Sequence, residues 1–288
     1  MKSSVKSDRY FVYLHEGYVD SFCRGFLPLA RPVELNDPFE FLLPNKEYRN
    51  LKDWSNDVRT AKVFRQAYEN MFPQNQGHCS VDDFLDRMVE APAEITHGFI
   101  REYQNNVAAV FKHEASRNFA ILCCTKNENC ALMWAHYTRK HRGFMVELNR
   151  NQSPFSNIVQ EDLLLEVEYD KPRMPFELMD FNNMEVLVRN VARRKQEVWK
   201  YENEVRFLFG IETCKKNGSI VEEGDASQPG ARLLLSVPPK SLNGVVFGLA
   251  MNSDLKVKIK EAMTSRTWGD FYIKQSAPSD SKFEFTYE

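Results

Sequence analysis

NFAILCCT, residues 118–125, decides the fold class of this chain. Before it, residues 51–115 carry apolar residues three and four apart, which is the spacing of amphipathic helices. After it, apolar residues gather in short runs that are typical of buried strands. The stretch is therefore predicted to be a central strand, and the change of pattern indicates an α+β protein with a mixed, largely antiparallel core and flanking helices.

Further strands and helices are predicted on both sides of this stretch. The predicted strands are residues 10–14, 26–30, 144–149, 163–170, 203–212, 233–239, 242–250 and 268–277. The predicted helices are residues 16–24, 131–141 (about three turns), 177–202 and 253–263, and residues 215–231 are expected to form a loop. A helix start is also predicted at residues 34–41, where Asp37 can cap, Pro38 suits the first turn and Glu40 completes a capping box.

The length of 288 residues favours a single domain, residues 1–288, with a helical insert at about 51–115. Within the insert, two helices are expected with a break near Pro92. The 43% of hydrophobic residues can build a core, and the net charge of −2 argues against a protein that coats nucleic acid over its whole surface.

The six cysteines form no CxxC pair, so we expect neither a disulfide framework nor a metal site. No apolar run approaches the length of a membrane span, and the first residues lack the apolar core of a secretory signal. A cytoplasmic protein without a membrane partner is expected. Walker, GxGxxG, GxSxG and HExxH motifs are absent, which disfavours the common enzyme classes that depend on them.

The densest group of aromatic and imidazole residues is ALMWAHYTRKH, residues 131–141. On a helix, Trp134, Tyr137 and His141 form one stripe, while His136 lies off it. One interpretation is that the aromatic residues are core and the histidines satisfy the helix end. The other is a surface that stacks a base or a nicotinamide ring.

A second group is RRKQEVWKYENEVRFLF, residues 193–209. Glu202, Glu204 and Arg206 alternate, so in a strand their side chains share one face. They either form a surface strip in which Arg206 balances the acids, or they include a catalytic or ribose-binding carboxylate kept ionised by Arg206.

Two basic runs lie beside these groups. They contain Arg139, Lys140 and Arg142 in the first, and Arg193, Arg194 and Lys195 in the second. The runs are either solvated helix faces or the lining of a groove for a phosphate backbone, with RNA favoured over DNA.

NDPFEF (36–41), ALMWAHYTRKHRGFMVEL (131–148) and VWKYENEVRFLF (198–209), in that order, resemble a bacterial family catalogued as domain of unknown function 2971. The order of strands, together with the Glu202-Asn203-Glu204 pair, more distantly resembles ADP-ribosyltransferases, including the DarT-like enzymes that modify DNA.

The second resemblance implies NAD as substrate, transfer of ADP-ribose to RNA, DNA or protein, and a toxin or phage-defence effector held by an antitoxin or chaperone. It implies Glu204 as the catalytic acid, with Glu202 positioning the acceptor and Arg206 fixing the carboxylates. The residues implied to contact NAD are His15, Thr125, Trp134, Tyr137 and His141, and Arg9 is the other candidate on the opening strand.

Two alternatives remain at this stage. A degenerate fold could bind a nucleotide or a partner without catalysis. A nuclease could instead hold Mg²⁺ with Asp37, Glu40, Glu202 and Glu204, and would then require metal.

Overall fold

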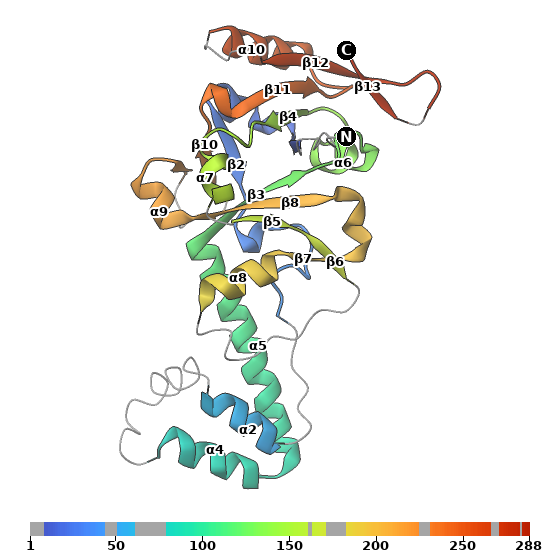
Figure 1. The fold of residues 1–288 in the computed structure, drawn as a ribbon. Helices are drawn as coiled ribbons and strands as arrows, with labels where there is room; N and C mark the ends of the chain where they lie inside the picture. The colour runs from blue at the N-terminus through green and yellow to red at the C-terminus, as the bar shows by residue number, and fades with distance from the viewer. Residues whose placement is uncertain are drawn as a thin grey trace, which may run out of the picture.

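The computed structural model describes residues 9–43, 51–60, 79–160, 163–170, 183–224, 231–265, 271–282 and 284–288. An eight-stranded sheet forms its centre (Figure 1). The strands, in chain order, are β1 (Tyr10–Leu14), β3 (Phe119–Thr125), β4 (Phe144–Leu148), β5 (Leu164–Glu166), β8 (Glu204–Gly210), β11 (Leu242–Phe247), β12 (Tyr272–Pro278) and β13 (Phe285–Tyr287). Their order in the sheet is β13-β12-β11-β4-β1-β3-β8-β5.

Neighbouring strands of this sheet run antiparallel except β11 and β12, which are parallel. NFAILCCT is confirmed as a central strand, β3, which lies between β1 and β8. The prediction of a mixed, largely antiparallel core with flanking helices is likewise confirmed.

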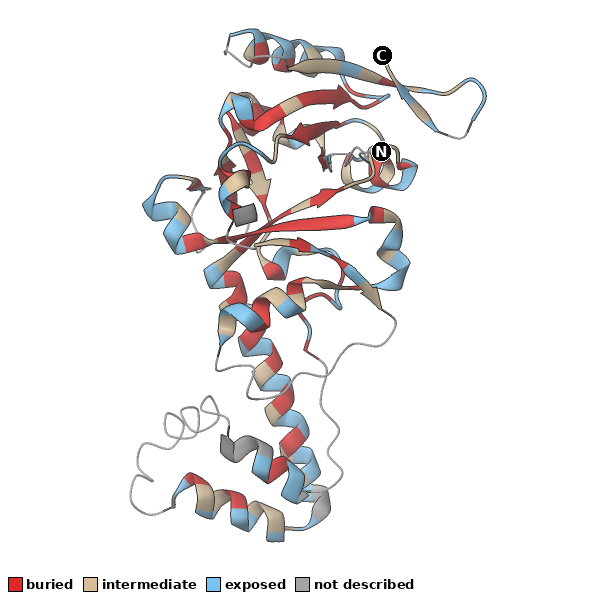
Figure 2. Cartoon of the chain, viewed as in Figure 1, coloured by how far each residue is buried: buried red, intermediate tan, exposed pale blue. Residues whose placement is uncertain are grey.

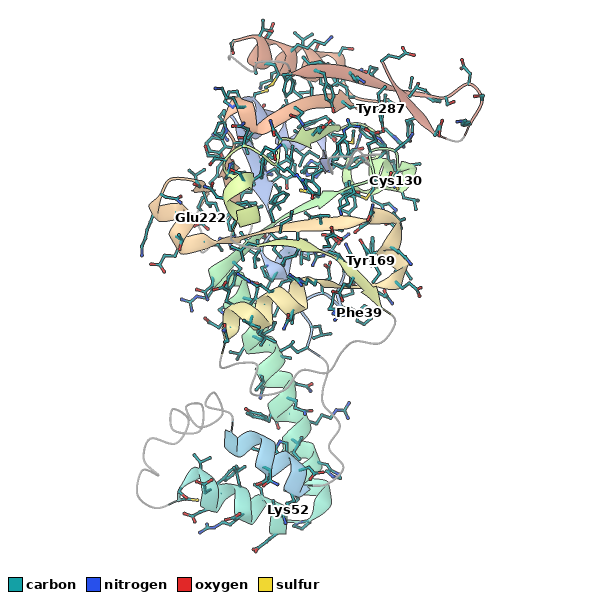
Figure 3. All side chains as sticks on the ribbon, in the orientation of Figure 1. Phe39, Lys52, Cys130, Tyr169, Glu222 and Tyr287 are labelled. Atoms are coloured by element: carbon teal, nitrogen blue, oxygen red, sulfur yellow. The ribbon has the colours of Figure 1, made fainter. Side chains whose placement is uncertain are left out.

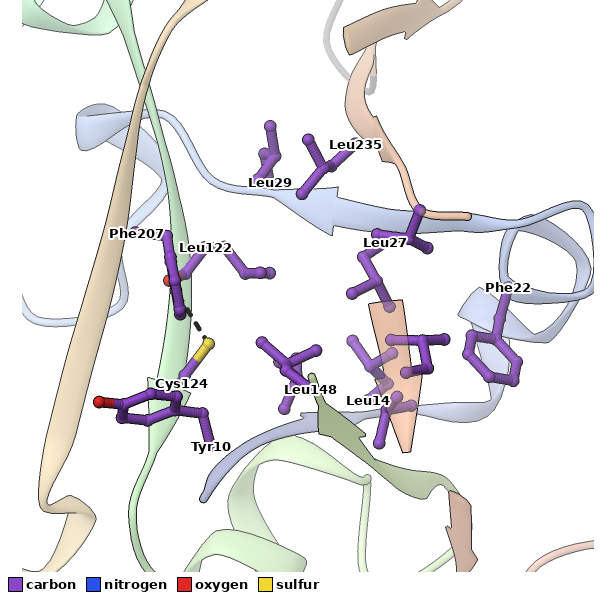
Figure 4. Packing of buried hydrophobic residues seen from close by; sticks show 14 of the residues in the cluster. Tyr10, Leu14, Phe22, Leu27, Leu29, Leu122, Cys124, Leu148, Phe207 and Leu235 are labelled. Carbon is purple, nitrogen blue, oxygen red and sulfur yellow. Dashed lines mark hydrogen bonds between the residues drawn. The ribbon is translucent and has the colours of Figure 1, made fainter. Parts of the chain in front are cut away.

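Two smaller sheets complete the fold. Strands β2 (Phe26–Leu29), β10 (Arg232–Ser236) and β9 (Ile220–Glu223) form an antiparallel sheet, and β6 (Glu168–Asp170) pairs with β7 (Arg194–Gln196) in parallel. Leu27, Leu29 and Leu235 of the first small sheet pack toward Leu122 and Phe207 of the main sheet (Figure 4). Burial of these side chains holds the two sheets together.

Strand β9 corrects the loop predicted for residues 215–231. Ile220 is buried and pairs with Leu235, so the strand forms because a partner far along the chain covers its apolar residue. Residues 225–230 of that predicted loop lie outside the described residues.

The α-helices are α1 (Val19–Cys23), α2 (Leu51–Thr60), α4 (Val81–Glu90), α5 (Ala93–Asn118), α6 (Ala131–Tyr137), α7 (Phe155–Gln160), α8 (Met184–Ala192), α9 (Ile211–Lys216) and α10 (Ser253–Thr264). Short 3-10 helices are η1 (Glu16–Tyr18), η2 (Pro32–Glu34), η5 (Glu197–Glu202) and η6 (Pro239–Ser241). None of the helices in the described ranges is long and apolar enough to cross a membrane.

Helices α2, α4 and the first half of α5 extend away from the sheets (Figure 1). The break expected near Pro92 is present, since α4 ends at Glu90 and Pro92 immediately precedes α5. Further along α5, Phe111 and Ala115 join a hydrophobic cluster with Leu208 of β8, and the helix continues directly into β3. Buried residues follow α5 from the projecting end to the sheet (Figure 2).

The helix start predicted at residues 34–41 is wrong. Residues 38–41 form a turn, in which the Asp37 side chain accepts from the Phe39 backbone N–H at 2.9 Å, and Phe41 has a positive φ of 54°. The Glu40 side chain binds Arg206 instead of closing a capping box. An ion pair with a distant residue has therefore replaced the local cap.

The helix predicted over residues 131–141 ends early. Helix α6 has seven residues, and Arg139, Lys140 and His141 all have positive φ. The positive φ angles at these residues allow the chain to turn directly from α6 into β4. Gly143, in the same turn, packs so closely against the end of β1 that a Cβ there would lie 1.9 Å from the Leu14 carbonyl oxygen.

The single helix predicted over residues 177–202 is three elements in the described part, 183–202: α8, β7 and η5. Residues 177–182 lie outside the described residues. Arg194 forms ion pairs with Glu168 and Asp170 of β6, and the neighbouring Lys195 is buried. Pairing with β6 thus converts a sequence with helical spacing into a strand.

Candidate functional site

Five charged residues from separate parts of the chain meet in the interior. Together they form the charged cluster, which consists of Glu40, Lys195, Glu202, Glu204 and Arg206. Each of the five is at most 6% exposed. Buried charges are costly unless they are paired, so the pairing within the cluster is a requirement of the fold.

Glu202 and Glu204 reach the cluster from two different elements. Glu202 is the last residue of η5, Asn203 adopts a left-handed conformation with φ 44°, and Glu204 begins β8. The prediction that Glu202, Glu204 and Arg206 all project from one strand is therefore wrong for Glu202, which precedes the strand. Glu204 and Arg206 do share a face of β8, and the turn at Asn203 brings Glu202 to the same side.

Arg206 fixes two carboxylates, but not the pair expected. Its Nε donates to Glu204 Oε1 at 2.8 Å and its Nη2 donates to Glu204 Oε2 at 3.0 Å. Nη2 also donates to Glu40 Oε1, and Nη1 donates to the Ala192 carbonyl at 2.9 Å. The planar guanidinium thus joins β8 to the turn at Glu40 and to the end of α8.

Lys195 holds the Glu202–Glu204 pair together. Its Nζ lies 2.5 Å from Glu202 Oε2 and 2.9 Å from Glu204 Oε2, and 5.1 Å from the centre of the Trp199 ring. Sequence reasoning placed Lys195 in a solvated or nucleic-acid-binding run and missed this role. The position of Lys195 directly after Arg193 and Arg194 gave no sign that its side chain turns inward.

The two carboxyl groups of the pair differ in acidity. Burial alone would raise the pKa of Glu204, but the charges of Arg206 and Lys195 and their hydrogen bonds lower it to about 2. Burial raises the pKa of Glu202, and the adjacent Glu204 charge adds to this, against the opposing effect of Lys195. Glu204 is therefore ionised at neutral pH, and Glu202 is the more basic carboxylate of the pair.

Tyr137 connects Glu202 to the surface of the site. Its hydroxyl donates to Glu202 Oε1 and accepts from the Asn36 side-chain amide at 3.1 Å. Burial and the Glu202 charge both raise the pKa of Tyr137, so it stays protonated. On the other side, the hydroxyl of Tyr169 (labelled in Figure 3) accepts from the Glu204 backbone N–H at 2.7 Å.

A cavity of about 440 Å³ opens beside these groups, a size within the range of small-molecule sites. All five members of the charged cluster line it. The other polar lining residues include His15, Tyr18, Asn36, Tyr137 and Arg232. Because five separate segments contribute these side chains, the cavity is the strongest candidate for a functional site among the described residues.

One comparison with known proteins bears on this region. Residues 133–207 match the model of a family described as Protein of unknown function (DUF2971). This DUF2971 segment runs from α6 to β8 and contains Tyr137, Lys195, Glu202, Glu204 and Arg206. No curated protein and no solved structure matches the chain. The match supports the family resemblance drawn from the sequence and assigns no activity.

His15 and Thr125, which lie before the DUF2971 segment, have different surroundings. His15 follows β1 directly and lines the cavity, and its Nδ1 accepts from the Gly17 backbone N–H at 3.0 Å. Thr125 is fully buried at the end of β3, where its hydroxyl donates to the Glu202 carbonyl and accepts from Asn127 N–H. Thr125 therefore fixes the backbone at Glu202 and does not line the cavity.

Within the DUF2971 segment, Trp134 and His141 lie apart from the cavity. Trp134 is fully buried, its ring packs edge-on against Tyr13, and His141 stacks on it with ring centres 6.2 Å apart. The stripe of Trp134, Tyr137 and His141 is thus divided: Tyr137 lines the cavity, whereas the buried Trp134 and the half-buried His141 pack beside Phe285.

The predicted basic residues do not line the cavity, apart from Lys195. Arg139 and Lys140 are exposed, and Arg142 lies 3.6 Å from Glu16. Arg194 is bound to Glu168 and Asp170 on the small β6–β7 sheet, and Arg193 precedes it. Arg9, the other candidate on the opening strand, pairs with Glu128 and Glu147 away from the cavity.

The residues proposed as magnesium ligands in the nuclease alternative are arranged differently. In the ranges that the structure describes, no group of three or more His, Cys, Asp or Glu side chains is placed to hold a metal. Glu40, Glu202 and Glu204 are joined through Lys195 and Arg206 instead. None of the six cysteines forms a disulfide.

Proposed function

We propose that this chain is an ADP-ribosyltransferase-like enzyme that cleaves NAD and transfers ADP-ribose to a macromolecular acceptor. The observation that carries the proposal is that His15, Tyr137 and the Glu202–Glu204 pair line one cavity, although they come from the turn after β1, from α6 and from the junction of η5 and β8. An imidazole, a phenol and two carboxylates are among the groups that the resemblance implies around NAD.

Glu204 supplies the negative charge in this proposal. Cleavage of the bond between ribose C1′ and the nicotinamide nitrogen leaves positive charge on the ribose, and nicotinamide departs with the bonding electrons. A carboxylate fixed in advance by Arg206 and Lys195 stabilises that charge without reorganising. When all five groups of the charged cluster are ionised, three carboxylates and two cations leave one negative charge beside the cavity, which suits a cationic ring.

Glu202 is assigned to the acceptor. Its raised pKa makes it a better proton acceptor at neutral pH than an ordinary glutamate. The acceptor nucleophile forms its bond to C1′ and passes its proton to Glu202, while Tyr137 holds the carboxylate in place. Tyr137 and Tyr18 are the aromatic residues that would enclose the nicotinamide, in place of the buried Trp134.

RNA or another nucleic acid is favoured as the acceptor because aromatic side chains follow one another next to Glu202. The Trp199 and Tyr201 rings are 6.1 Å apart, and the Tyr201 hydroxyl lies 3.1 Å from His136 Nδ1. All three are at least partly exposed. Such rings can stack unpaired bases regardless of sequence. From the resemblance to ADP-ribosyltransferases we also propose that the protein is a toxin or phage-defence effector whose activity a protein partner restrains.

The test is incubation of the purified chain with NAD labelled in the adenylate half, separately with RNA, DNA and protein. Label transfer that Glu204→Gln abolishes supports the proposal and identifies the acceptor. Glu212→Gln is the matched control, because Glu212 is an exposed glutamate paired with Lys216 and should retain full transfer. Equal transfer by both variants would overturn the role of Glu204.

One observation favours a second function, a nucleotide- or partner-binding module without catalysis. Both oxygens of Glu204 already accept hydrogen bonds from Arg206 or Lys195, as expected of a structural ion-pair network. Release of nicotinamide separates the two functions, since a binding module would retain NAD without releasing any.

A further inference from the structure

The loop between β3 and α6, residues 126–130, is bound to the C-terminal strand. The Asn129 side chain pairs with the Phe285 backbone as a neighbouring strand would, since its Nδ2 donates to the Phe285 carbonyl at 2.9 Å and its Oδ1 accepts from the Phe285 N–H at 2.9 Å. The hydroxyl of Tyr287, which is labelled in Figure 3, donates to the Glu128 carbonyl. Strand β13 therefore holds the loop, although Asn129 and Phe285 are 156 positions apart in the chain.

The other end of the loop is bound to the turn that carries Glu202. The Lys126 backbone N–H donates to the Asn203 carbonyl at 3.1 Å, and the Thr125 hydroxyl donates to the Glu202 carbonyl. The Thr125 oxygen also accepts from the Asn127 N–H at 2.8 Å, which leaves its own proton free to point at Glu202. The turn needs this support, because Asn203 has a positive φ of 44°, a conformation that few residues other than glycine adopt.

A hydrogen bond inside the loop joins its two ends. Asn127 Oδ1 accepts from the Asn129 backbone N–H at 3.1 Å. A continuous series of hydrogen bonds thus runs from β13 to the site through Phe285, Asn129, Asn127, Thr125 and Glu202. Asn129 and Phe285 do not line the cavity, so they act on the site only through this series.

Strand β13 contributes little else to the fold. It has three residues at the edge of the main sheet, and each is exposed or half-buried (Figure 2). Phe285 packs against Trp134 and His141, beside the loop, with ring centres 6.3 and 5.4 Å apart. The largest hydrophobic cluster of the described residues contains none from β13. Loss of the pairing with Asn129 should therefore leave the sheet folded.

We propose that Asn129 is a positioning residue, which couples β13 to the turn at Glu202 and Asn203 and so keeps the Glu202 carboxylate in the cavity. The C-terminal strand then belongs to the site as well as to the edge of the sheet. Without the two hydrogen bonds from Asn129, the loop opens locally and the turn loses the carbonyl contacts that fix it. The inference rests on the proposed function only for its effect on transfer.

Amide hydrogen exchange followed by NMR tests the coupling. In Asn129→Ala, exchange of the Lys126 amide should be about tenfold faster, as expected when two hydrogen bonds that close the loop are lost. The amides of β10, which pairs with β2 and β9, should keep their native rates. Asn217→Ala is the control, since Asn217 is exposed and its Oδ1 accepts from the Ser219 N–H in a turn outside this series.

Transfer kinetics give a second readout. In Asn129→Ala, kcat should fall by about tenfold because Glu202 is misplaced, while the KM for NAD stays unchanged because Asn129 does not line the cavity. A purely structural role for Asn129 would lower Tm without this division between kcat and KM.

The outcomes separate the coupling from the proposed function. Faster exchange at Lys126 alone supports the coupling even where the native chain transfers no ADP-ribose, and then only the transferase proposal fails. Unchanged exchange at Lys126 overturns the coupling, and so does an equal acceleration in β10, which would show a general loss of stability. Where the native chain does transfer, an unchanged kcat in Asn129→Ala also overturns the positioning role and leaves the transferase standing.

Discussion

The Lys195 ammonium and the Glu204 carboxylate meet 2.9 Å apart in the interior, and Glu202 shares the same ammonium at 2.5 Å. Two carboxylates that would repel one another are thereby held side by side. The arrangement determines the acidity of both glutamates and the stability of the strand that carries one of them.

Replacing Lys195 with methionine should destabilise the fold. Methionine is also unbranched and only slightly shorter than lysine, but it leaves Glu202 without its cation, and breaking a buried ion pair typically costs about 3–5 kcal/mol. The free energy of unfolding measured in denaturant should fall by that amount. Lys216→Met is the control, since this exposed lysine pairs with Glu212 at the surface, and its loss should leave the free energy of unfolding almost unchanged. Similar small effects in both variants would contradict the structure of the charged cluster.

Stability should fall as the pH drops from about 5 toward 2. The pKa of Glu204 is lowered to about 2 in the folded chain against an ordinary value of 4.5, so the unfolded chain takes up its proton first. The contribution of Glu204 is complete above the ordinary pKa and is lost as pH approaches 2. Above about pH 5, the contribution of Glu204 to the free energy of unfolding amounts to about 3 kcal/mol. Denaturant unfolding at several pH values measures the slope, and Glu204→Gln should flatten it in this range.

Tyr137→Phe should change the pH dependence of transfer more than it changes stability. The phenol donates to Glu202 Oε1, and removing that bond raises the pKa of Glu202 further. The acidic limb of a kcat profile should shift to higher pH, with a loss of about 0.5–1.5 kcal/mol in unfolding free energy. Tyr272→Phe is the control, because the Tyr272 hydroxyl donates to Glu147, and neither residue lines the cavity. Identical pH profiles for both variants would argue against Glu202 as the group that accepts the proton of the acceptor nucleophile.

Two glycine substitutions should have opposite effects. At Gly143 a new Cβ would lie 1.9 Å from the Leu14 carbonyl oxygen, so Gly143→Ala must displace β1 or the turn and should destabilise by about 1–3 kcal/mol or more. Gly98 lies within α5 with no atom within 4 Å of the added Cβ, so Gly98→Ala should stabilise by up to about 1 kcal/mol. Thermal unfolding of both variants checks the signs. A neutral Gly143→Ala would contradict the close approach of the two segments.

The sequence by itself determined the local features. Alternating and continuous apolar runs identified β3 and β8, because strand pattern depends on which residues face a core. The proline at position 92 located the break between α4 and α5. Glu202, Glu204 and Tyr137 were found as candidates because acids and phenols beside apolar runs are unusual.

Only the tertiary structure decided how those residues are paired. Glu40 binds Arg206 from 166 positions away, and that ion pair removed the expected helix cap. Lys195 turned inward because β6 paired with its strand, and Arg232 reached the cavity through the pairing of β10 with β2. Burial and ion pairing depend on contacts between distant segments, so propensities read over a few residues contain no information about them.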